Sequence, residues 1–264
     1  MDIPLYQIDA FAARIFAGNP AAVCPLTAWL ADETMQAIAM ENNLSETAFL
    51  VARAGEADGY DIRWFTPTME IDLAGHPTLA AAWVVFERLR PGSIRVRFRS
   101  GGGDILAADR QDELIALDFP ARPATRDLPV GDVAAALGAR PTQVWAARDA
   151  LAVFATEAEV RGLAPDMAAL ARLDVFGVIA SAPGEDCDFV SRFFAPRAGI
   201  PEDPVTGSAH CTLIPYWAER FGTSTLFARQ ISRRGGELWC EYRGDRVRIA
   251  GRAACYMEGA VHLP

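Results

Sequence analysis

Short runs of strand-like residues, some alternating between apolar and polar and others wholly apolar, recur along the chain between turn residues and predict short β-strands. The pattern predicts strands in the first half at residues 4–12, 21–24, 47–52, 60–65, 94–99, 105–108 and 114–119. In the second half it predicts strands near 144–145, 151–155, 175–181, 189–194, 237–242, 247–250 and 253–257. Helical spacing is expected at 32–41, 79–88, 132–137, 165–173 and 211–219. The mixture of elements predicts the α+β class.

One ordered set of features occurs twice. The first copy is Arg63-Trp64-Phe65-Thr66-Pro67 followed by Asp72, Gly75 and His76, and the second is Arg192-Phe193-Phe194-Ala195-Pro196 followed by Asp203, Gly207 and Ser208. Each copy contains an aromatic strand, a proline stop, an acidic loop and a glycine that opens a helix. This recurrence predicts a duplicated architecture of two pseudo-symmetric halves.

A proline-rich segment at residues 120–129 is the best candidate for a linker between the halves. We therefore expect an N-terminal half at residues 1–118 and a C-terminal half at residues 119–264. The last strand, about residues 253–264, is free to pack back on the N-terminal half.

The two predicted helix starts carry the candidate chemistry. Pro77 suits the first position of a helix, which places His76 at or near the N-cap, and Ser208 can cap its own helix. Gly75 and Gly207 let a ligand approach the unpaired N–H groups there. Two such helix starts facing one another would hold a small carboxylated molecule and stabilise developing negative charge. Plain capping roles for His76 and Ser208 are the alternative interpretation.

Glu46 is the one acidic residue in the stretch Asn42-Asn43-Leu44-Ser45-Glu46-Thr47-Ala48-Phe49-Leu50-Val51. It stands where the chain leaves a predicted helix and enters an apolar strand. Burial disfavours the charged form of a carboxyl group, which suits a group that both takes and gives a proton. The alternative is a surface glutamate that caps a turn.

Composition and charge exclude several classes of partner. The formal net charge is −9, and no basic run that could match a nucleic-acid backbone is present. No apolar stretch approaches a membrane span, and the N-terminus has no signal-like segment, so a cytoplasmic location is expected. The five cysteines are scattered and the three histidines show no ligand spacing. Neither a disulfide framework nor a metal site is predicted.

Several blocks of the sequence resemble the PhzF-like family, named for the phenazine-biosynthesis isomerase, which has the diaminopimelate epimerase-like fold. These blocks are Asp9-Ala10-Phe11, Gly18-Asn19-Pro20-Ala21-Ala22-Val23, Asn43-Leu44-Ser45-Glu46-Thr47-Ala48-Phe49, Ala74-Gly75-His76-Pro77-Thr78 and Glu202-Asp203-Pro204-Val205-Thr206-Gly207-Ser208-Ala209-His210. The resemblance implies two halves, each a curled, barrel-like sheet around a central helix, with the site in the cleft between them. It also implies a homodimer.

The resemblance further implies a cofactor-independent isomerase of the trans-2,3-dihydro-3-hydroxyanthranilate isomerase type, acting on a small unsaturated cyclic carboxylic acid. Glu46 would be the general acid/base, and His76 and Asp203 would position the substrate amine or hydroxyl. Ser45, Gly75, Gly207 and Ser208 would contribute hydrogen bonds. The related epimerases carry a thiol at each helix start, whereas this chain has His76 and Ser208 there.

Two other functions stay open. An amino- or imino-acid racemase or epimerase would need a second base, for which His76, Asp203 and His210 are the candidates. A non-catalytic protein would bind a small molecule in the same cleft without turnover. The sequence names neither the substrate nor the pathway, and it leaves the roles of Cys211 and His210 undefined.

Overall fold

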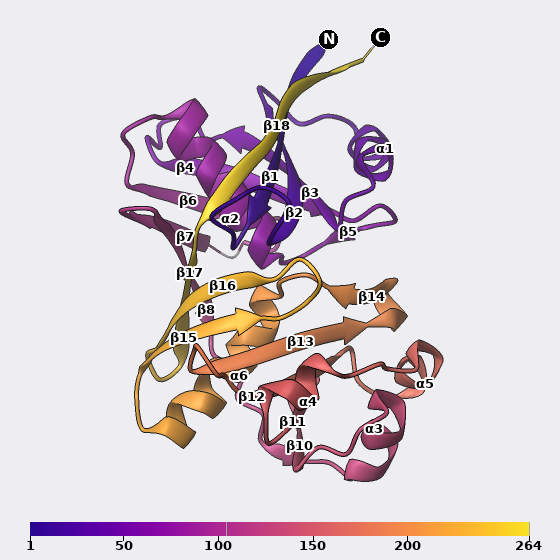
Figure 1. The fold of residues 1–264 in the computed structure, drawn as a ribbon. Coiled ribbons are helices and arrows are strands. Elements are labelled where there is room, and N and C mark those ends of the chain that lie inside the picture. The colour runs from indigo at the N-terminus through magenta and orange to yellow at the C-terminus, as the bar shows by residue number, and fades with distance from the viewer. Residues whose placement is uncertain (104, 264) are drawn as a thin grey trace. The chain divides into compact units, whose positions relative to one another are not determined.

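Two units of related topology make up the chain in the computed structural model, which describes residues 1–103 and 105–263. Unit 1 comprises Met1–Asp118 and Ala250–Pro264, and unit 2 comprises Phe119–Ile249. The last residue of the predicted terminal strand, Pro264, lies outside the described residues. Figure 1 shows the elements of both units in chain order.

Unit 1 is built on a sheet in which neighbouring strands follow the order β18-β1-β2-β3-β4-β6-β7-β8. The β2/β3 and β4/β6 pairs are parallel and the other pairs are antiparallel. A short strand, β5, pairs with the end of β4. The bounds are β1 Asp2–Ala10, β2 Asn19–Leu26, β3 Glu46–Ala52, β4 Gly59–Phe65, β5 Glu70–Ile71, β6 Arg95–Arg99, β7 Ile105–Gln111, β8 Leu114–Pro120 and β18 Ala253–His262.

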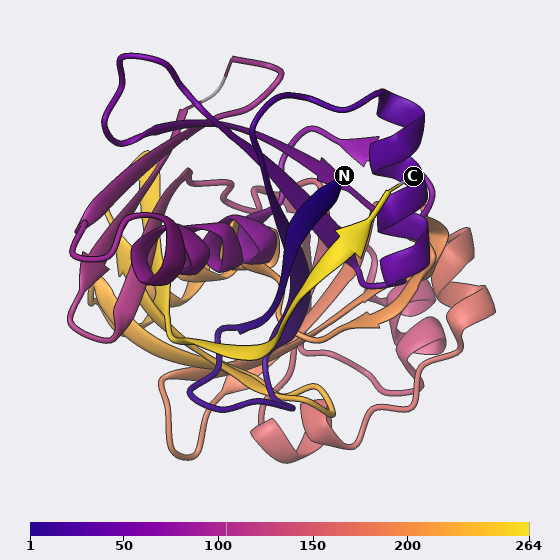
Figure 2. The ribbon, with the colours of Figure 1, turned by 90° about the horizontal axis from the view of Figure 1, so that it is seen from above.

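The helix α2 (Gly75–Val84), which continues into a π-helical turn at Val85–Leu89, is almost wholly buried in unit 1. It packs against β1, β2, β3 and β18, and Figure 2 shows these strands around it. The other helix, α1 (Asp32–Asn42), connects β2 to β3 and buries Met35, Ile38 and Ala39. Unit 1 is therefore a curled sheet around a central helix.

The start of α2 differs from the prediction. The helix begins at Gly75, so His76 is its second residue and Ala74 is the N-cap. His76 thus lies near the N-cap, but the predicted first helical position of Pro77 was wrong by two residues. Pro77 is accepted as the third residue because the N–H groups of the first turn have no acceptor within the helix, so proline forfeits no hydrogen bond there.

Unit 2 repeats this plan with strands in the order β9-β10-β11-β12-β13-β15-β16. The β11/β12 and β13/β15 pairs are parallel, and the short β14 pairs with the end of β13. The bounds are β9 Arg126–Asp127, β10 Gln143–Ala146, β11 Ala150–Val153, β12 Val178–Pro183, β13 Phe189–Ala195, β14 Ile200–Asp203, β15 Thr225–Gln230 and β16 Gly236–Tyr242. The chain returns to unit 1 through β17 (Arg246–Gly251).

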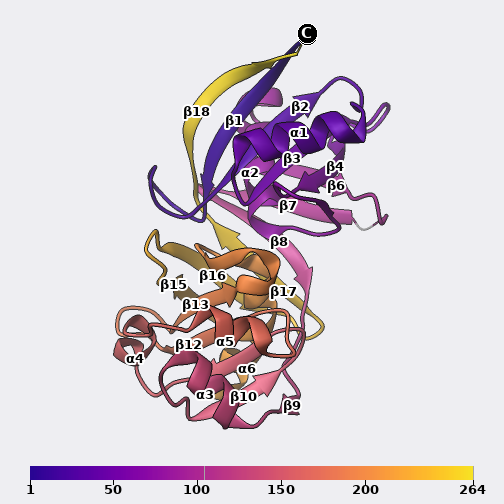
Figure 3. The same cartoon turned by 90° about the vertical axis from the view of Figure 1, so that its right-hand side faces the viewer.

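The order of elements along the chain gives the helices of unit 2, labelled in Figure 3, places equivalent to those of unit 1. Two short helices, α4 (Glu157–Arg161) and α5 (Met167–Arg172), connect β11 to β12, as α1 connects β2 to β3. The helix α6 (Gly207–Phe221) follows β14 as α2 follows β5, and it packs against β15 and β16. A further helix, α3 (Val130–Leu137), and a 3-10 turn at Pro196–Ala198 complete the unit. The α+β class and the duplicated architecture are confirmed.

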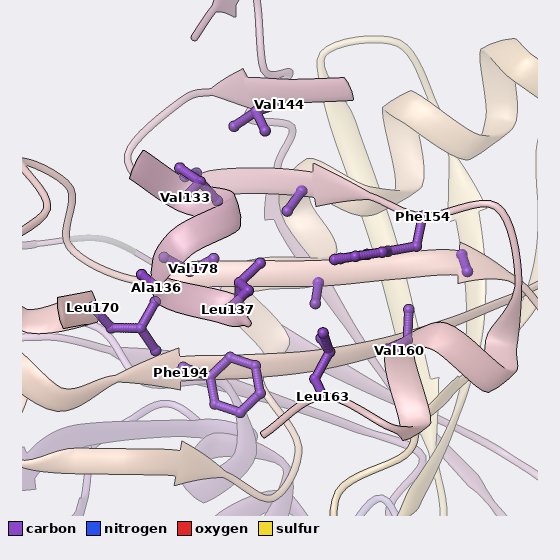
Figure 4. Packing of buried hydrophobic residues seen from close by; sticks show 14 of the residues in the cluster. Val133, Ala136, Leu137, Val144, Phe154, Val160, Leu163, Leu170, Val178 and Phe194 are labelled. Atoms are coloured by element: carbon purple, nitrogen blue, oxygen red, sulfur yellow. The ribbon is translucent and has the colours of Figure 1, made fainter. Parts of the chain in front are cut away.

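Opposite faces of the unit 2 sheet carry different helices. The core in Figure 4 joins residues of α3, α4 and α5, such as Leu137, Val160 and Leu170, to Val178 and Phe194 of the sheet. On the other face, Trp217 of α6 donates its indole N–H to Ser181 Oγ at 3.0 Å and stacks on Phe189. Since successive strand residues point to opposite faces, α6 lies on the face away from α3, α4 and α5.

Within residues 1–103 and 105–263, no helix is long and apolar enough to cross a membrane. The same residues contain no group of three or more histidine, cysteine or acidic side chains placed to hold a metal ion.

His210 is fully buried in α6, against the ring of Phe189. Its Nδ1 atom lies 2.8 Å from the carbonyl oxygen of Thr206, so Nδ1 carries the hydrogen and donates it. Nε2 has no hydrogen-bond partner among the described residues. Burial lowers the pKa of His210 from 6.5 to about 4, because a charged imidazole would lose its hydration.

We predict that His210 makes the stability of the chain depend on pH. The unfolded chain binds this proton near pH 6.5, whereas the folded chain binds it only near pH 4, so the unfolding free energy falls as pH decreases through this window. The loss attributable to His210 should be about 3 kcal/mol. Urea unfolding of wild type and His210→Asn at several pH values measures it. Equal pH dependence in the two proteins would contradict the prediction.

Candidate active site

Four polar side chains meet in unit 1, at the end of the sheet where β2 and β3 begin. Asn19 is the first residue of β2, Glu46 is the first residue of β3, and Ser45 precedes it. The two strands are parallel, with Ala21 opposite Glu46, so both begin at the same end. His76, the second residue of α2, reaches the same place from the central helix.

These side chains form a connected chain of contacts. Nε2 of His76 lies 3.1 Å from Oε2 of Glu46, and Nδ1 of His76 lies 3.2 Å from Nδ2 of Asn19. Ser45 Oγ donates a hydrogen bond to Asn19 Oδ1 at 3.4 Å. Glu46 is 8% exposed, His76 5% and Asn19 0%. Oε2 of Glu46 accepts no well-aligned hydrogen bond from the described residues, although it lies close to Nε2 of His76.

Two backbone turns with positive φ, at Asn43 and Gly18, place Glu46 and Asn19 in the site. Asn43 has a left-handed conformation with φ 50° and donates its N–H to the carbonyl of Ala39 at 3.2 Å, which ends α1 and directs the chain into β3. Gly18 has φ +66° immediately before Asn19. A Cβ atom at Gly18 would lie 2.1 Å from the carbonyl oxygen of Ala10, so only glycine fits.

A second set of candidate residues lies in unit 2, where β14 leads into α6. Asp203 is 7% exposed and accepts a hydrogen bond from Thr206 Oγ1. The buried side chain of Gln230 spans the same loop, donating to Asp203 O at 2.7 Å and accepting from Thr206 N at 2.8 Å. Together these bonds fix the carboxylate of Asp203 close to the first turn of α6.

Ser208 takes a different role from the predicted one. The helix begins at Gly207 and its N-cap is Thr206, so Ser208 is the second residue and does not cap α6. Instead, Arg148 donates from Nη2 to Ser208 Oγ at 3.1 Å. Asp149 also orients this guanidinium, accepting from Nη2 at 3.0 Å and from Nε at 3.3 Å, and the ring of Phe176 lies 4.4 Å from its carbon.

Arg148 lies between the buried carboxylate of Asp149 and a cavity. Burial raises the pKa of the Asp149 carboxyl, and the nearby Arg148 and Arg122 guanidinium groups oppose that shift. Arg148 and Phe176 also line a cavity of about 450 Å³, together with Asp174 and Arg197. Arg148 Nη1 has no hydrogen-bond partner among the described residues, so the guanidinium can still bind an anion.

The strand register relates Arg148 to Asn19. Ala21 pairs with Glu46 in the parallel β2/β3 ladder, and Ala150 pairs with Val178 in the equivalent β11/β12 ladder. The residues two positions before Ala21 and Ala150 are Asn19 and Arg148, and each contacts the second residue of the central helix of its unit. Unit 2 has Val178 at the position equivalent to Glu46. Of these two equivalent positions, only the one in unit 1 carries a carboxylate.

The thiol of Cys211 is not placed as a base. It lies one helical turn after Gly207, with Sγ 3.7 Å from the Gly207 carbonyl oxygen. Burial raises its pKa to about 12, so the thiol stays protonated at neutral pH.

The predicted site residues thus occur as two local groups. Ser45, Glu46, Gly75 and His76 lie together in unit 1, and Asp203, Gly207 and Ser208 lie at the β14–α6 junction of unit 2. Sequence reasoning missed the contacts of Asn19 and Arg148, which are the side chains that touch His76 and Ser208. Asn19 belongs to a block shared with the PhzF-like family, yet no role was predicted for its side chain.

Comparison with known proteins identifies relatives over the whole chain. The family profile described as phenazine biosynthesis-like protein matches residues 8–259. A Pseudomonas aeruginosa protein named as an uncharacterized isomerase is 52% identical over 264 residues, with 100% of both sequences covered. The crystal structure of a phenazine biosynthesis protein of the PhzF family from Enterococcus faecalis has a TM-score of 0.95 and 46% identity, and the match covers 100% of both chains.

A more distant similarity concerns the fold alone. A hydroxyproline epimerase from Agrobacterium vitis, solved with bound trans-4-hydroxy-L-proline, has a TM-score of 0.65 at 11% identity, and the match covers 98% of this chain and 92% of that one. The predicted diaminopimelate epimerase-like fold is therefore confirmed, as is the predicted resemblance to the PhzF-like proteins.

We predict that Gly18→Ala destabilises unit 1 more than Gly55→Ala. Both glycines have positive φ, but a Cβ at Gly55 would meet nothing within 4 Å. The left-handed conformation alone should cost about 1–2 kcal/mol in Gly55→Ala. The clash with Ala10 should add at least ~2 kcal/mol in Gly18→Ala. Urea unfolding at fixed pH measures both losses, and equal losses would show that Gly18 is not packed as described.

Proposed function

The chain belongs to the phenazine biosynthesis-like (PhzF) family of isomerases, and on this premise we propose that it moves a proton on a small unsaturated cyclic carboxylic acid. The observation that carries the proposal is the buried contact between Glu46 and His76 at 3.1 Å. A carboxylate shielded from water and held beside an imidazole suits general acid–base chemistry. The relatives' names supply the reaction class and not the substrate.

In the proposed mechanism Glu46 removes a proton from one substrate carbon and returns it to another. Electrons of the broken C–H bond move into the unsaturated system, and a double bond shifts when the proton comes back, so atoms and charge balance. The transient negative charge on the substrate needs hydrogen-bond donors, and the first turns of α2 and α6 and the side chain of His76 are the candidates. Ser45 and Gly75 complete the proposed contacts in unit 1.

Unit 2 supplies the proposed contacts to the polar groups of the substrate. Gly207 begins α6, whose first N–H groups lack partners within the helix, and Ser208 adds a hydroxyl. Arg148 brings a fixed positive charge beside Ser208, which favours a carboxylate ligand. Asp203, held by Thr206 and Gln230, is proposed to accept a hydrogen bond from a substrate amine or hydroxyl.

Proton transfer between carbons of such an acid requires no change of oxidation state, so the proposal invokes neither a cofactor nor a metal. A cytoplasmic location and a homodimer also remain proposals. Exposed apolar side chains support the dimer: Phe16 is 68% exposed and Tyr256 46%, and their rings pack together in unit 1.

The alternative reaction is racemisation or epimerisation of an amino or imino acid, which needs a base on each face of the carbon. Several groups that could have supplied the second base are not placed to do so, which leaves His76 and Asp203 of the three candidates. The strand position equivalent to Glu46 is Val178, Ser208 stands at the second helix start, and Cys211 is a buried, protonated thiol. His210 is enclosed in the core with its Nδ1 hydrogen donated to Thr206.

We predict that Glu46→Gln lowers turnover by a factor of at least ~100, the usual scale for loss of a general acid or base. Glutamine keeps the size and the polar contacts of the side chain but cannot exchange a proton, so the Kd of the substrate should change far less. Isomer formation is measured on whichever cyclic unsaturated acid the wild type converts. Near-normal turnover by a folded Glu46→Gln protein would end the assignment of this residue.

We also predict that Arg148→Gln weakens substrate binding. Loss of a charged hydrogen bond to a carboxylate should raise KM about 10-fold or more, with a smaller change in kcat. Arg172→Gln is the matched control, because Arg172 is an exposed arginine of the same unit at the end of α5. Unchanged KM in Arg148→Gln, or equal effects of the two substitutions, would remove Arg148 from the site.

A further inference from the structure

The contact between Asn19 and His76 determines which nitrogen of the imidazole carries the hydrogen. Nδ2 of a carboxamide is a donor and not an acceptor, so a hydrogen bond across the 3.2 Å separation requires an unprotonated Nδ1. In a neutral imidazole the hydrogen then resides on Nε2. That is the nitrogen that lies 3.1 Å from Oε2 of Glu46.

The Asn19 carboxamide presents its oxygen to Ser45 and its nitrogen to His76. Ser45 Oγ donates to Oδ1 at 3.4 Å, while Nδ2 faces the imidazole at 3.2 Å. A serine hydroxyl is also able to accept a hydrogen bond, so the protonation of His76 Nδ1 is what distinguishes this orientation from the reverse one. Asn19 is 0% exposed, so water does not compete for either group.

We propose that Asn19 is a positioning residue that holds His76 as the neutral tautomer with its hydrogen on Nε2. In this state His76 donates toward the site and has no lone pair there with which to accept a proton. Glu46 is left as the one base of the pair. This inference rests on the proposed function, and it explains how the pair formed by Glu46 and His76 contains one proton acceptor.

The other histidines of the chain provide internal references. His210 donates from Nδ1 to Thr206, so it should be the opposite tautomer, with its hydrogen on Nδ1. His262 is exposed, with Nδ1 2.8 Å from Asp2 Oδ1, so Nδ1 carries a hydrogen in that contact. These are the three histidines of the chain, and each has its own expected pattern of protonation.

The tautomers can be read from ¹⁵N–¹H correlation spectra of the substrate-free protein with ¹⁵N-labelled histidine, assigned with His76→Gln and His210→Asn. At neutral pH, His76 should show an unprotonated Nδ1 and a protonated Nε2, and His210 the reverse. A protonated Nδ1 in His76 would overturn the proposal, because it would require the carboxamide of Asn19 to point the other way.

Asn19→Asp tests the cause of the tautomer. An aspartate carboxylate can only accept, so it should place a hydrogen on Nδ1 of His76 and abolish the signal of an unprotonated Nδ1. Asn42→Asp is the matched control, because Asn42 donates to Thr47, next to Glu46, without touching His76. His76 should be unaltered in this control. Unaltered His76 signals in Asn19→Asp would contradict the proposal.

The wild-type spectrum decides the matter even if Asn19→Asp fails to fold. The result is also separate from the proposed function, since the spectra need neither substrate nor turnover. Activity of the Glu46→Gln protein would contradict the proposed mechanism, but it would not affect the assignment of the His76 tautomer. A protonated Nδ1 would remove the role of Asn19 and leave Glu46 as the candidate base.

Discussion

The parallel pairing of β2 with β3 is the constraint on which the candidate active site depends. Parallel neighbours begin at the same end of a sheet, so Asn19 comes together with Ser45 and the adjacent Glu46, although Ser45 lies 26 positions after Asn19 in the chain. The central helix α2 starts at that end and adds His76. A shift of the register by one residue would turn Glu46 to the opposite face of the sheet, away from the imidazole.

The same constraint acts in unit 2 with a different chemical outcome. Parallel pairing of β11 with β12 brings Arg148 to the start of α6, where it contacts Ser208. Because Val178 replaces the carboxylate, this unit offers a cation and a hydroxyl in place of an acid and an imidazole. The proposal therefore assigns proton transfer to the residues of unit 1 and the binding of an anion to those of unit 2.

Much of the candidate site could be predicted from the sequence. Glycine, proline and polar residues mark the boundaries of helices and strands locally, and these boundaries carry Glu46, Gly75, His76, Gly207 and Ser208. The helix starts were predicted less well, because Pro77 is tolerated throughout the first turn of a helix and not only at its first position. Asn19 and Arg148 were missed for a different reason. Their contacts join residues 57 and 60 positions apart, and only the strand register places them beside His76 and Ser208.

The central claim, that one carboxylate moves a proton within an unsaturated acid, is tested most directly by following deuterium. Dihydro-hydroxy aromatic acids, amino acids and proline derivatives would be incubated with the protein in heavy water and examined by NMR and mass spectrometry. Deuterium at a new carbon position, together with migration of a double bond, is the expected result. Exchange confined to the α-carbon with inversion of configuration and no migration would contradict it.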